Sequence, residues 1–253
     1  MSDDWSPEAV DFVQSLADTK LMLSHWYADQ AFLGPNMGDN IALFSMTQDE
    51  YGQVRQFYLQ LDRQGRDEDW LRSERDTGNF YNAATTDGPA ADWTEFEVKF
   101  GLTDRAALLL LDAIDHEDFT GLTDKMAEEE YSHTDFHDGW LEQLAAANPA
   151  AFQAALEDSL DDVLAFIGPA AYDEDTDPLY ASGFTDRSVA ELRDAFLDYL
   201  AGIVEGTDVD VPDTTEVPLE SWNEERRRVA AGSIEPDVLE TIRGSKNTEF
   251  AAE

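Results

Sequence analysis

The sequence predicts an all-α protein built as a helical bundle, and three observations carry this prediction. Apolar residues recur every three or four positions along several long segments, as they do in amphipathic helices. Helix-start signals precede several of these segments: Ser6-Pro7, Asn148-Pro149 and the capping box Ser188-x-x-Glu191. Strand signals are sparse. Helices of this kind bury their apolar faces against one another, so we expect a four-helix bundle with additional C-terminal helices.

The individual elements follow in chain order. The first helix begins at Pro7 and meets no breaker before Gly34-Pro35. The remaining segments with helical periodicity lie at about 39–64, 67–75, 92–115, 120–146, 148–167, 188–202 and 236–243. Residues 207–220 are polar, contain two prolines and are expected to be extended. No low-complexity linker divides the chain, so we expect one domain: a bundle over 1–206, and an extended C-terminal tail with a short helix over 207–253.

The chain is strongly acidic. Among its 253 residues, 56 acidic side chains stand against 16 basic ones, a formal net charge of −40. Such an excess destabilises a compact fold by self-repulsion. In molar salt the Debye length falls to about 3 Å and repulsion between surface charges is largely screened. We therefore expect a protein from a halophile. Nucleic acid and anionic membranes are not expected as partners, because both bind basic patches.

Several other site classes are excluded by composition. The chain has no cysteine, which rules out disulfides, thiolate zinc sites and iron–sulfur clusters. The N-terminal residues MSDDWSPEAV lack the basic region and apolar core of a signal peptide. No apolar run approaches the roughly 20 residues of a membrane span. The predicted localisation is cytoplasmic.

Helical phase places a few polar residues among apolar ones. In the 120–146 helix, Glu130 and His133 share a face with Met126 and Leu144, whereas Glu128 belongs to the opposite, solvated face. Charge that merely serves solubility is not distributed in this way. The apolar stripe of the 39–64 helix likewise contains two polar residues, Glu50 and Gln53. The stripe of the 92–115 helix contains one carboxylate, Asp104.

In the first helix, Asp29 shares a stripe with Met22 and Leu33, so four helices each offer an inward carboxylate. A dinuclear carboxylate centre in a four-helix bundle takes one carboxylate from two helices and Glu-x-x-His from the other two. The chain order here is carboxylate, Glu-x-x-Gln, carboxylate, Glu-x-x-His. The candidate metal ligands are Asp29, Glu50, Asp104, Glu130 and His133, with Gln53 in the place of a second histidine.

A salt-bridge network in a former metal cavity would show the same stripes. The basic residues near enough to neutralise the carboxylates are His25, Arg55, Arg105 and Lys125. Gln53 favours this alternative, because an amide oxygen is a poorer iron ligand than imidazole. His137 is expected to be a hydrogen-bonded core histidine, and the run Arg226-Arg227-Arg228 a solvated helix face.

Four segments carry a resemblance to a known family: LADTKLMLSHWYADQ, IALFSMTQDEYGQVRQFY, SERDTGNFYNAA and AEEEYSHTDFHDGWLEQL. They resemble the ferritin-like subunits of phenylacetyl-CoA epoxidase (phenylacetate-CoA oxygenase). The resemblance implies a ferritin-like four-helix bundle within a multicomponent monooxygenase that uses oxygen and NADPH. That complex epoxidises the aromatic ring of phenylacetyl-CoA in phenylacetic acid catabolism. It pairs a di-iron catalytic subunit with a structural homologue whose site has decayed, and adds smaller subunits and a reductase.

Two hypotheses follow from the resemblance. The pair Gly52-Gln53 resembles the Gly-Gln pair in the second helix of the structural subunit. Glu50, Glu130 and His133 instead match positions of iron ligands in the catalytic subunit. The chain is then either a scaffold that positions a catalytic homologue, or itself a di-iron or mixed-metal catalytic subunit with a Gln-substituted site. A third, weaker hypothesis is a free-standing ferritin-like iron oxidase. A homo- or hetero-oligomer is expected in each case.

Overall fold

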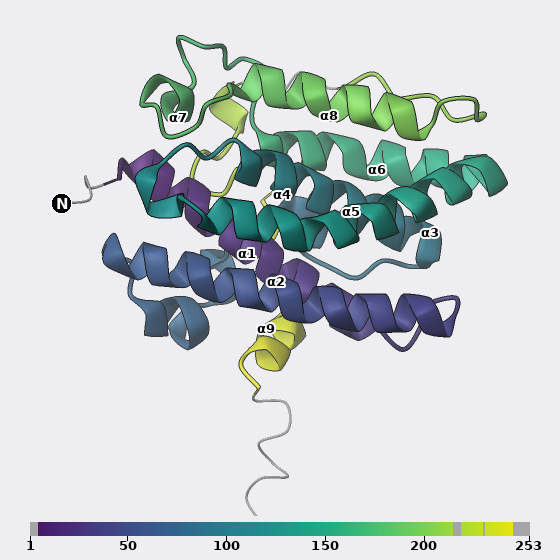
Figure 1. Cartoon of the computed structure of the whole chain (residues 1–253), viewed down its shortest axis with the longest axis horizontal. Coiled ribbons are helices and arrows are strands. Elements are labelled where there is room, and N and C mark those ends of the chain that lie inside the picture. Colours follow the sequence, from purple (N-terminus) through teal and green to yellow (C-terminus); the bar gives the residue numbers. More distant parts are fainter. Residues whose placement is uncertain (1–4, 215–218, 230, 245–253) are drawn as a thin grey trace, which may run out of the picture.

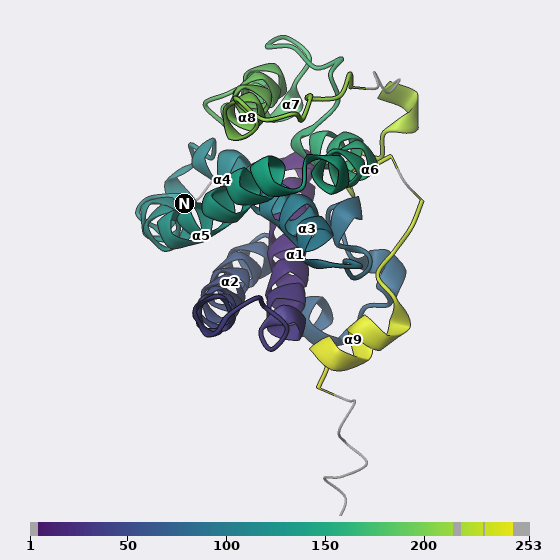
Figure 2. The same cartoon turned by 90° about the vertical axis from the view of Figure 1, so that its right-hand side faces the viewer.

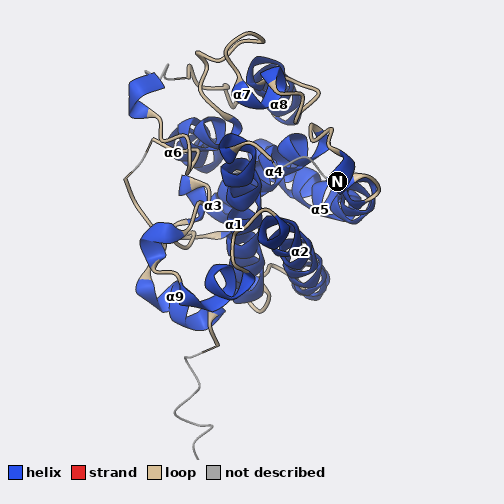
Figure 3. Cartoon of the chain, turned by 90° about the vertical axis from the view of Figure 1, so that its left-hand side faces the viewer, coloured by secondary structure: helices blue, strands red, loops and turns tan. Residues whose placement is uncertain are grey.

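The computed structural model describes residues 5–214, 219–229 and 231–244. Throughout these ranges the regular structure is helical and no strand occurs (Figure 3). The predicted all-α fold, consistent with a ferritin-like helical bundle, is confirmed. No helix in the described part is both long enough and apolar enough to span a membrane.

The helices lie in layers, with α8 on one outer side, α2 and α9 on the opposite side and α1 between them (Figures 1 and 2). Short turns join neighbouring helices along the chain, which places α1 beside α2 and α5 beside α6. The α-helices are α1 (Pro7–Gln30), α2 (Met37–Arg63), α3 (Trp93–Phe96), α4 (Leu102–Asp112), α5 (Leu122–Ala147), α6 (Pro149–Ile167), α7 (Pro178–Ala181), α8 (Val189–Ile203) and α9 (Pro236–Ile242).

The central helix α1 has no solvated face over most of its length. From Ala9 to Tyr27, only Asp11 and His25 are not fully buried. Ser6 caps the helix by accepting a hydrogen bond from the backbone N–H of Ala9. Because α1 is covered on all sides, its sequence lacks the one-sided apolar stripe that reveals orientation in a surface helix.

The predicted helix over 92–115 has the expected extent but is not regular. A π-helical turn, Glu97–Gly101, separates α3 from α4. Such turns insert one extra residue and occur often near functional sites. Gly101 lies against α5, where a Cβ atom would be 3.0 Å from Nδ1 of His137. The close approach of the two helices therefore requires glycine, and the turn directs Glu97 into the core.

The arginine run of the C-terminal segment is not a solvated helix face, and that prediction is wrong. Arg227 and Arg228 are buried. Arg227 donates from Nε to the carbonyl of Phe166 at 2.9 Å and Arg228 pairs with Asp87, while Trp222 donates to the carbonyl of Ala165. Trp222 and Arg227 thus satisfy carbonyls at the end of α6 that have no partner within the helix. The run therefore attaches the C-terminal segment to the bundle.

Candidate metal centre and its lysine

Four of the predicted ligands meet in the core of the bundle. Glu50 comes from α2, Asp104 from α4, and Glu130 and His133 from α5. One ligand atom from each lies within 4.8 Å of the others, and all four side chains are buried. Carboxylate and imidazole ligands suit divalent iron, so this group could hold a metal ion. Their role as ligands stays a prediction.

The structure adds a residue to this group, Lys20 of α1. Its Nζ lies 2.7 Å from Oε1 of Glu130, 2.9 Å from Oε1 of Glu50 and 3.3 Å from Oδ1 of Asp104. An ammonium group has three donors, and here each has a carboxylate acceptor. Lys20 is completely buried. Its Nζ thus takes the position between the carboxylates that a bound cation would occupy.

As arranged, these residues do not fit a pair of iron ions. A dinuclear centre of this type draws on four carboxylates and two histidines. Here three carboxylates and one histidine converge, and the ammonium of Lys20 fills the space among the carboxylates. A metal ion and an ammonium group cannot both occupy that space.

Gln53 is a further reason why these residues do not fit a di-iron site. Its Nε2 donates to Oε1 of Glu130 at 2.8 Å, so the amide presents an N–H group to the carboxylates. A ligating histidine would present a lone pair in that place. The Oε1 atom of Gln53 is buried and has no hydrogen-bond partner among the described residues. The side chain therefore acts as a donor to Glu130.

His133 lies between two groups of carboxylates. Its Nδ1 is 3.3 Å from Glu50, 3.4 Å from Glu130 and 3.6 Å from Asp104, and its Nε2 is 3.6 Å from Asp49. Burial favours the neutral ring, but the surrounding carboxylates outweigh this effect and raise the pKa of His133 well above 6.5. With the carboxylates placed in this way, the charged form of the His133 ring is favoured over the neutral form that would ligate a metal.

Burial and the neighbouring charges also oppose each other in setting the pKa values of Lys20, Asp104 and Glu130. Burial favours a neutral amine, yet the three carboxylates hold the pKa of Lys20 well above its usual 10.5. Against the effect of burial, Lys20 lowers the pKa values of Asp104 and Glu130. With Lys20 and the charged form of His133 facing three carboxylates, one acid has no matching charge.

That acid is Glu50, and its titration gives a testable pH dependence. Burial raises the pKa of Glu50 from 4.5 to about 7. The negative charges of Glu130 and Asp104 act in the same direction, and the positive charge of Lys20 opposes them. Between these pH values the folded chain holds a proton that the unfolded chain has released. The free energy of unfolding should therefore fall, by on the order of 3 kcal/mol, as pH rises from about 4.5 to about 7.

The variant Glu50→Gln isolates this effect, because it keeps an acceptor for Lys20 and removes the charge. We expect the stability difference between variant and wild type to grow in favour of the variant as pH rises from about 4.5 to about 7, and to level off above that. Urea unfolding in molar KCl at a series of pH values measures it, since salt screens the surface acids and not the buried cluster. A difference that does not change with pH would contradict the raised pKa.

Asp29 is not part of the cluster, and its predicted inward orientation is wrong. Its side chain is exposed. Asp29 lies nine positions after Lys20, which is half a turn out of phase at about 3.6 residues per turn. Since Lys20 faces the carboxylates, Asp29 faces away from them.

The expected neutralising residues also act elsewhere. Arg105 pairs with Asp138, and Lys125 is largely exposed and pairs with Glu129 one turn along α5. Sequence reasoning missed Lys20, although one signal was present. It stands in a stretch of α1 with no polar face, where a lysine has to be buried and therefore paired.

A chain of hydrogen bonds leads from the cluster toward α3. The hydroxyl of Tyr27 donates to Oδ2 of Asp104 at 3.1 Å and lies 3.0 Å from Nε2 of His137. Nδ1 of His137 is 2.7 Å from Oε2 of Glu97 in the π-helical turn. His137 is thus a hydrogen-bonded core histidine, as predicted. These bonds hold Asp104 in the orientation in which it meets Lys20.

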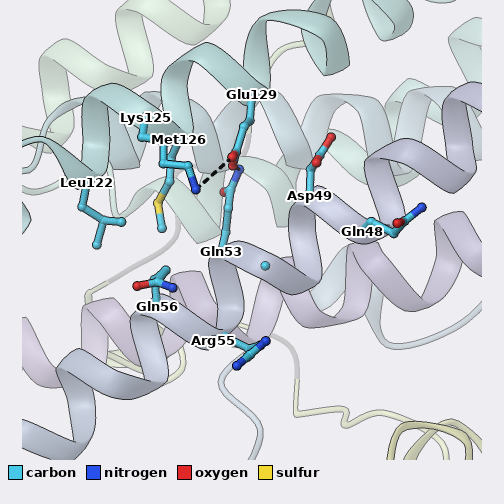
Figure 4. Close-up of a pocket in the computed structure, with 10 residues that line it drawn as sticks. Gln48, Asp49, Gln53, Arg55, Gln56, Leu122, Lys125, Met126 and Glu129 are labelled. Atoms are coloured by element: carbon cyan, nitrogen blue, oxygen red, sulfur yellow. Dashed lines mark hydrogen bonds and ion pairs between the residues drawn. The ribbon is translucent and has the colours of Figure 1, made fainter.

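A polar pocket of about 280 Å³ lies between α2 and α5, beside the cluster (Figure 4). Gln53 lines it, as do Asp49 and Gln56 of α2 and Lys125 and Glu129 of α5. Figure 4 shows the Lys125–Glu129 ion pair above the amide of Gln53. Because Gln53 also bonds Glu130, its side chain separates this pocket from the buried carboxylates.

Comparison with known proteins places the chain in a family. The sequence gives no significant match to curated proteins. It does match the family model of the phenylacetic acid catabolic protein over residues 1–233, which is most of the chain. The helical bundle and the buried acid cluster are what the resemblance of the individual segments implied. The chain therefore belongs to the phenylacetic acid catabolic protein family, with a role in the breakdown of phenylacetic acid.

Proposed function

We propose that this chain is the structural subunit of a multicomponent monooxygenase that epoxidises the ring of phenylacetyl-CoA. In this proposal it pairs with a di-iron catalytic homologue in the cytoplasm of a halophile, and smaller subunits and a reductase complete the complex. The observation that carries the proposal is the position of Lys20. Its ammonium lies among Glu50, Asp104 and Glu130, where a catalytic subunit would hold metal.

The cluster is suited to a structural role. Breaking a buried ion pair is costly, so each carboxylate needs its cation in place. Lys20 joins α1 to α2, α4 and α5 through one nitrogen atom, and Gln53 adds a bond from α2 to Glu130. A core tied in this way holds the bundle in one arrangement and presents a fixed surface to a partner.

The alternative is a catalytic subunit with a Gln-substituted metal site. One observation favours it: Glu50, Asp104, Glu130 and His133 retain the types and the proximity of metal ligands. Metal binding would then require Lys20 to leave the carboxylates and His133 to lose its proton. The structural role needs neither change.

Elemental analysis separates the two roles. We expect the chain, purified in high salt, to contain no stoichiometric iron or manganese and to show no epoxidation of phenylacetyl-CoA alone. Together with its co-purifying partners, we expect iron and activity to follow the second ferritin-like chain. Stoichiometric iron in this chain, with activity in the absence of that second chain, would overturn the structural role.

A further inference from the structure

A small pocket of about 90 Å³ opens between α1, α2 and α9. We call it the α9 pocket. Its lining is apolar or aromatic apart from two arginines: Leu21, Val54, Ile242, Tyr51, Tyr58, Arg55 and Arg72. The α9 pocket is separate from the polar pocket beside the cluster, although Arg55 borders both. Figure 4 shows the side chain of Arg55 extending from α2 away from Gln53 and Glu129.

The α9 pocket is apolar at its base and charged at its mouth. Three of its side chains are exposed by less than a tenth and form the base: Leu21, Val54 and Tyr58. Three others are exposed and form the mouth: Tyr51, Arg55 and Arg72. A ligand that fits this arrangement has an apolar end, which enters first, and a polar or charged end, which remains near the solvent.

The base of the pocket is held in place by hydrogen bonds. The hydroxyl of Tyr58 donates to Asp18 at 3.1 Å and accepts from Arg75 at 2.6 Å, so it belongs to that buried ion pair. Arg243, which directly follows α9, donates to the backbone carbonyl of Arg75 at 2.6 Å and attaches α9 to the same region. A ligand therefore meets walls that are already formed, and little of its binding free energy is lost in ordering them.

The charge of the α9 pocket is opposite to that of the chain. Among the described residues no acid lines it, although the whole chain has 56 acids and only 16 basic residues. Acids do line the polar pocket beside the cluster and the hollow between α3 and α6: Asp49, Glu129, Asp92, Glu95 and Asp158. Arg72 is paired with Glu68 at 2.6 Å, but Arg55 forms no ion pair with any described residue. A guanidinium without a counter-ion beside an apolar pocket favours a carboxylate as the ligand.

We propose that the α9 pocket binds a small apolar carboxylate, with its hydrocarbon group against Leu21, Val54 and Ile242 and its carboxylate at Arg55. An apolar cavity of about 150 Å³ holds a benzene ring. An open pocket of about 90 Å³ therefore takes up one ring in part, or a short branched chain. An aromatic acid gains a further ring contact with Tyr51 at the mouth.

The role of the family in the breakdown of phenylacetic acid makes phenylacetate the acid of this class to which the chain is exposed. The α9 pocket lies outside the buried cluster, so this binding does not depend on whether the chain is a structural or a catalytic subunit. Because Arg55 belongs to α2 and Ile242 to α9, a bound acid connects the two helices. Binding should therefore stabilise the attachment of α9 to the bundle.

Saturation-transfer NMR of the full chain in molar KCl tests the proposal, with phenylacetate titrated at constant potassium concentration. We expect saturable binding with a dissociation constant on the order of 1 mM, as for a ligand of this size. Arg55→Gln should raise this constant about tenfold or more, because it removes a hydrogen bond between two charged groups. Arg63→Gln is the matched control: Arg63 is exposed on the same helix and bonds Gln60, outside the pocket. It should leave the dissociation constant unchanged.

Two further ligands separate the contributions of ring and charge. Phenylacetamide keeps the ring and lacks the charge, whereas acetate keeps the charge and lacks the ring. Each should bind at least about tenfold more weakly than phenylacetate, because each loses one of the two contacts.

Three results would overturn the proposal. The first is the absence of saturable binding of phenylacetate by the wild type. The second is a loss on Arg55→Gln that does not exceed the loss on Arg63→Gln, which would indicate a general attraction to positive charge. The third is binding of phenylacetamide or acetate as tight as that of phenylacetate, which would show that the pocket does not recognise an apolar carboxylate.

Discussion

Replacing Lys20 with methionine is expected to lower the free energy of unfolding by about 3–5 kcal/mol, because it leaves buried carboxylates without their cation. Methionine is close to lysine in volume, so the loss reports charge rather than a cavity. Urea unfolding in molar KCl measures it. Lys125→Met is the matched control: its ion pair with Glu129 is exposed, so removing it should cost less than about 1 kcal/mol. Equal losses in the two variants would contradict the importance of the buried lysine.

The smaller variant Lys20→Ala tests whether the cluster retains the capacity to hold metal. Removing the side chain frees the space among Glu50, Asp104 and Glu130. We expect Co²⁺ to raise the melting temperature of this variant and to produce a visible absorption band, while the wild type shows neither. A ligand at about 100 times its dissociation constant adds about 2.7 kcal/mol of stability, which is readily measured.

Removing His133 as well provides the control for this metal test. The double variant Lys20→Ala/His133→Ala should lose most of the stabilisation by Co²⁺, because the cluster then lacks its imidazole. Equal uptake of Co²⁺ by the wild type would show that Lys20 does not block the site. If Lys20→Ala gains nothing from the metal, the cluster is an ion-pair network without the capacity for metal.

A second large effect is expected at the ion pair of Arg75 and Asp18. Both side chains are buried, and Asp18 accepts hydrogen bonds from Arg75 Nη1 at 2.6 Å and Nη2 at 2.5 Å. Asp18 also accepts from the hydroxyl of Tyr58 and the backbone N–H of Tyr81. Through these bonds α1 holds the loop that follows α2. Arg75→Met should therefore destabilise the chain by about 3–5 kcal/mol.

The double variant Arg75→Met/Asp18→Leu tests whether the loss arises from an unpaired charge. Its destabilisation should be clearly smaller than the sum of the two single ones, since neither charge is then left alone. Tyr58→Phe removes a hydroxyl that donates to Asp18 and accepts from Arg75 but leaves the ion pair in place, so it should cost about 1.5–3 kcal/mol, less than Arg75→Met. Additive losses in the double variant would show that packing, rather than the ion pair, dominates at this position.

Most of the long helices could be predicted, because each carries its own local signals. The starts of α1, α6 and α8 follow from Ser6-Pro7, Asn148-Pro149 and the Ser188 capping box. The inward positions of Glu50, Glu130 and Asp104 were also predictable, since each lies three or four positions from apolar residues that share its helix face. In the stretch MAEEEYSH, Glu128 is exposed and Glu130 buried, as helical phase predicts.

The helical architecture, the inward acids of three helices and the resemblance to phenylacetyl-CoA epoxidase subunits follow from local sequence signals alone. Only the tertiary structure showed what neutralises these acids. A helix that is buried all round has no stripe from which its phase can be deduced, so Lys20 was missed and Asp29 was assigned inward. The burial of Arg227 was likewise decided by the end of α6, 60 residues earlier in the chain, to which its guanidinium is hydrogen-bonded. Partners so distant in sequence are brought together only by the packing of the whole bundle.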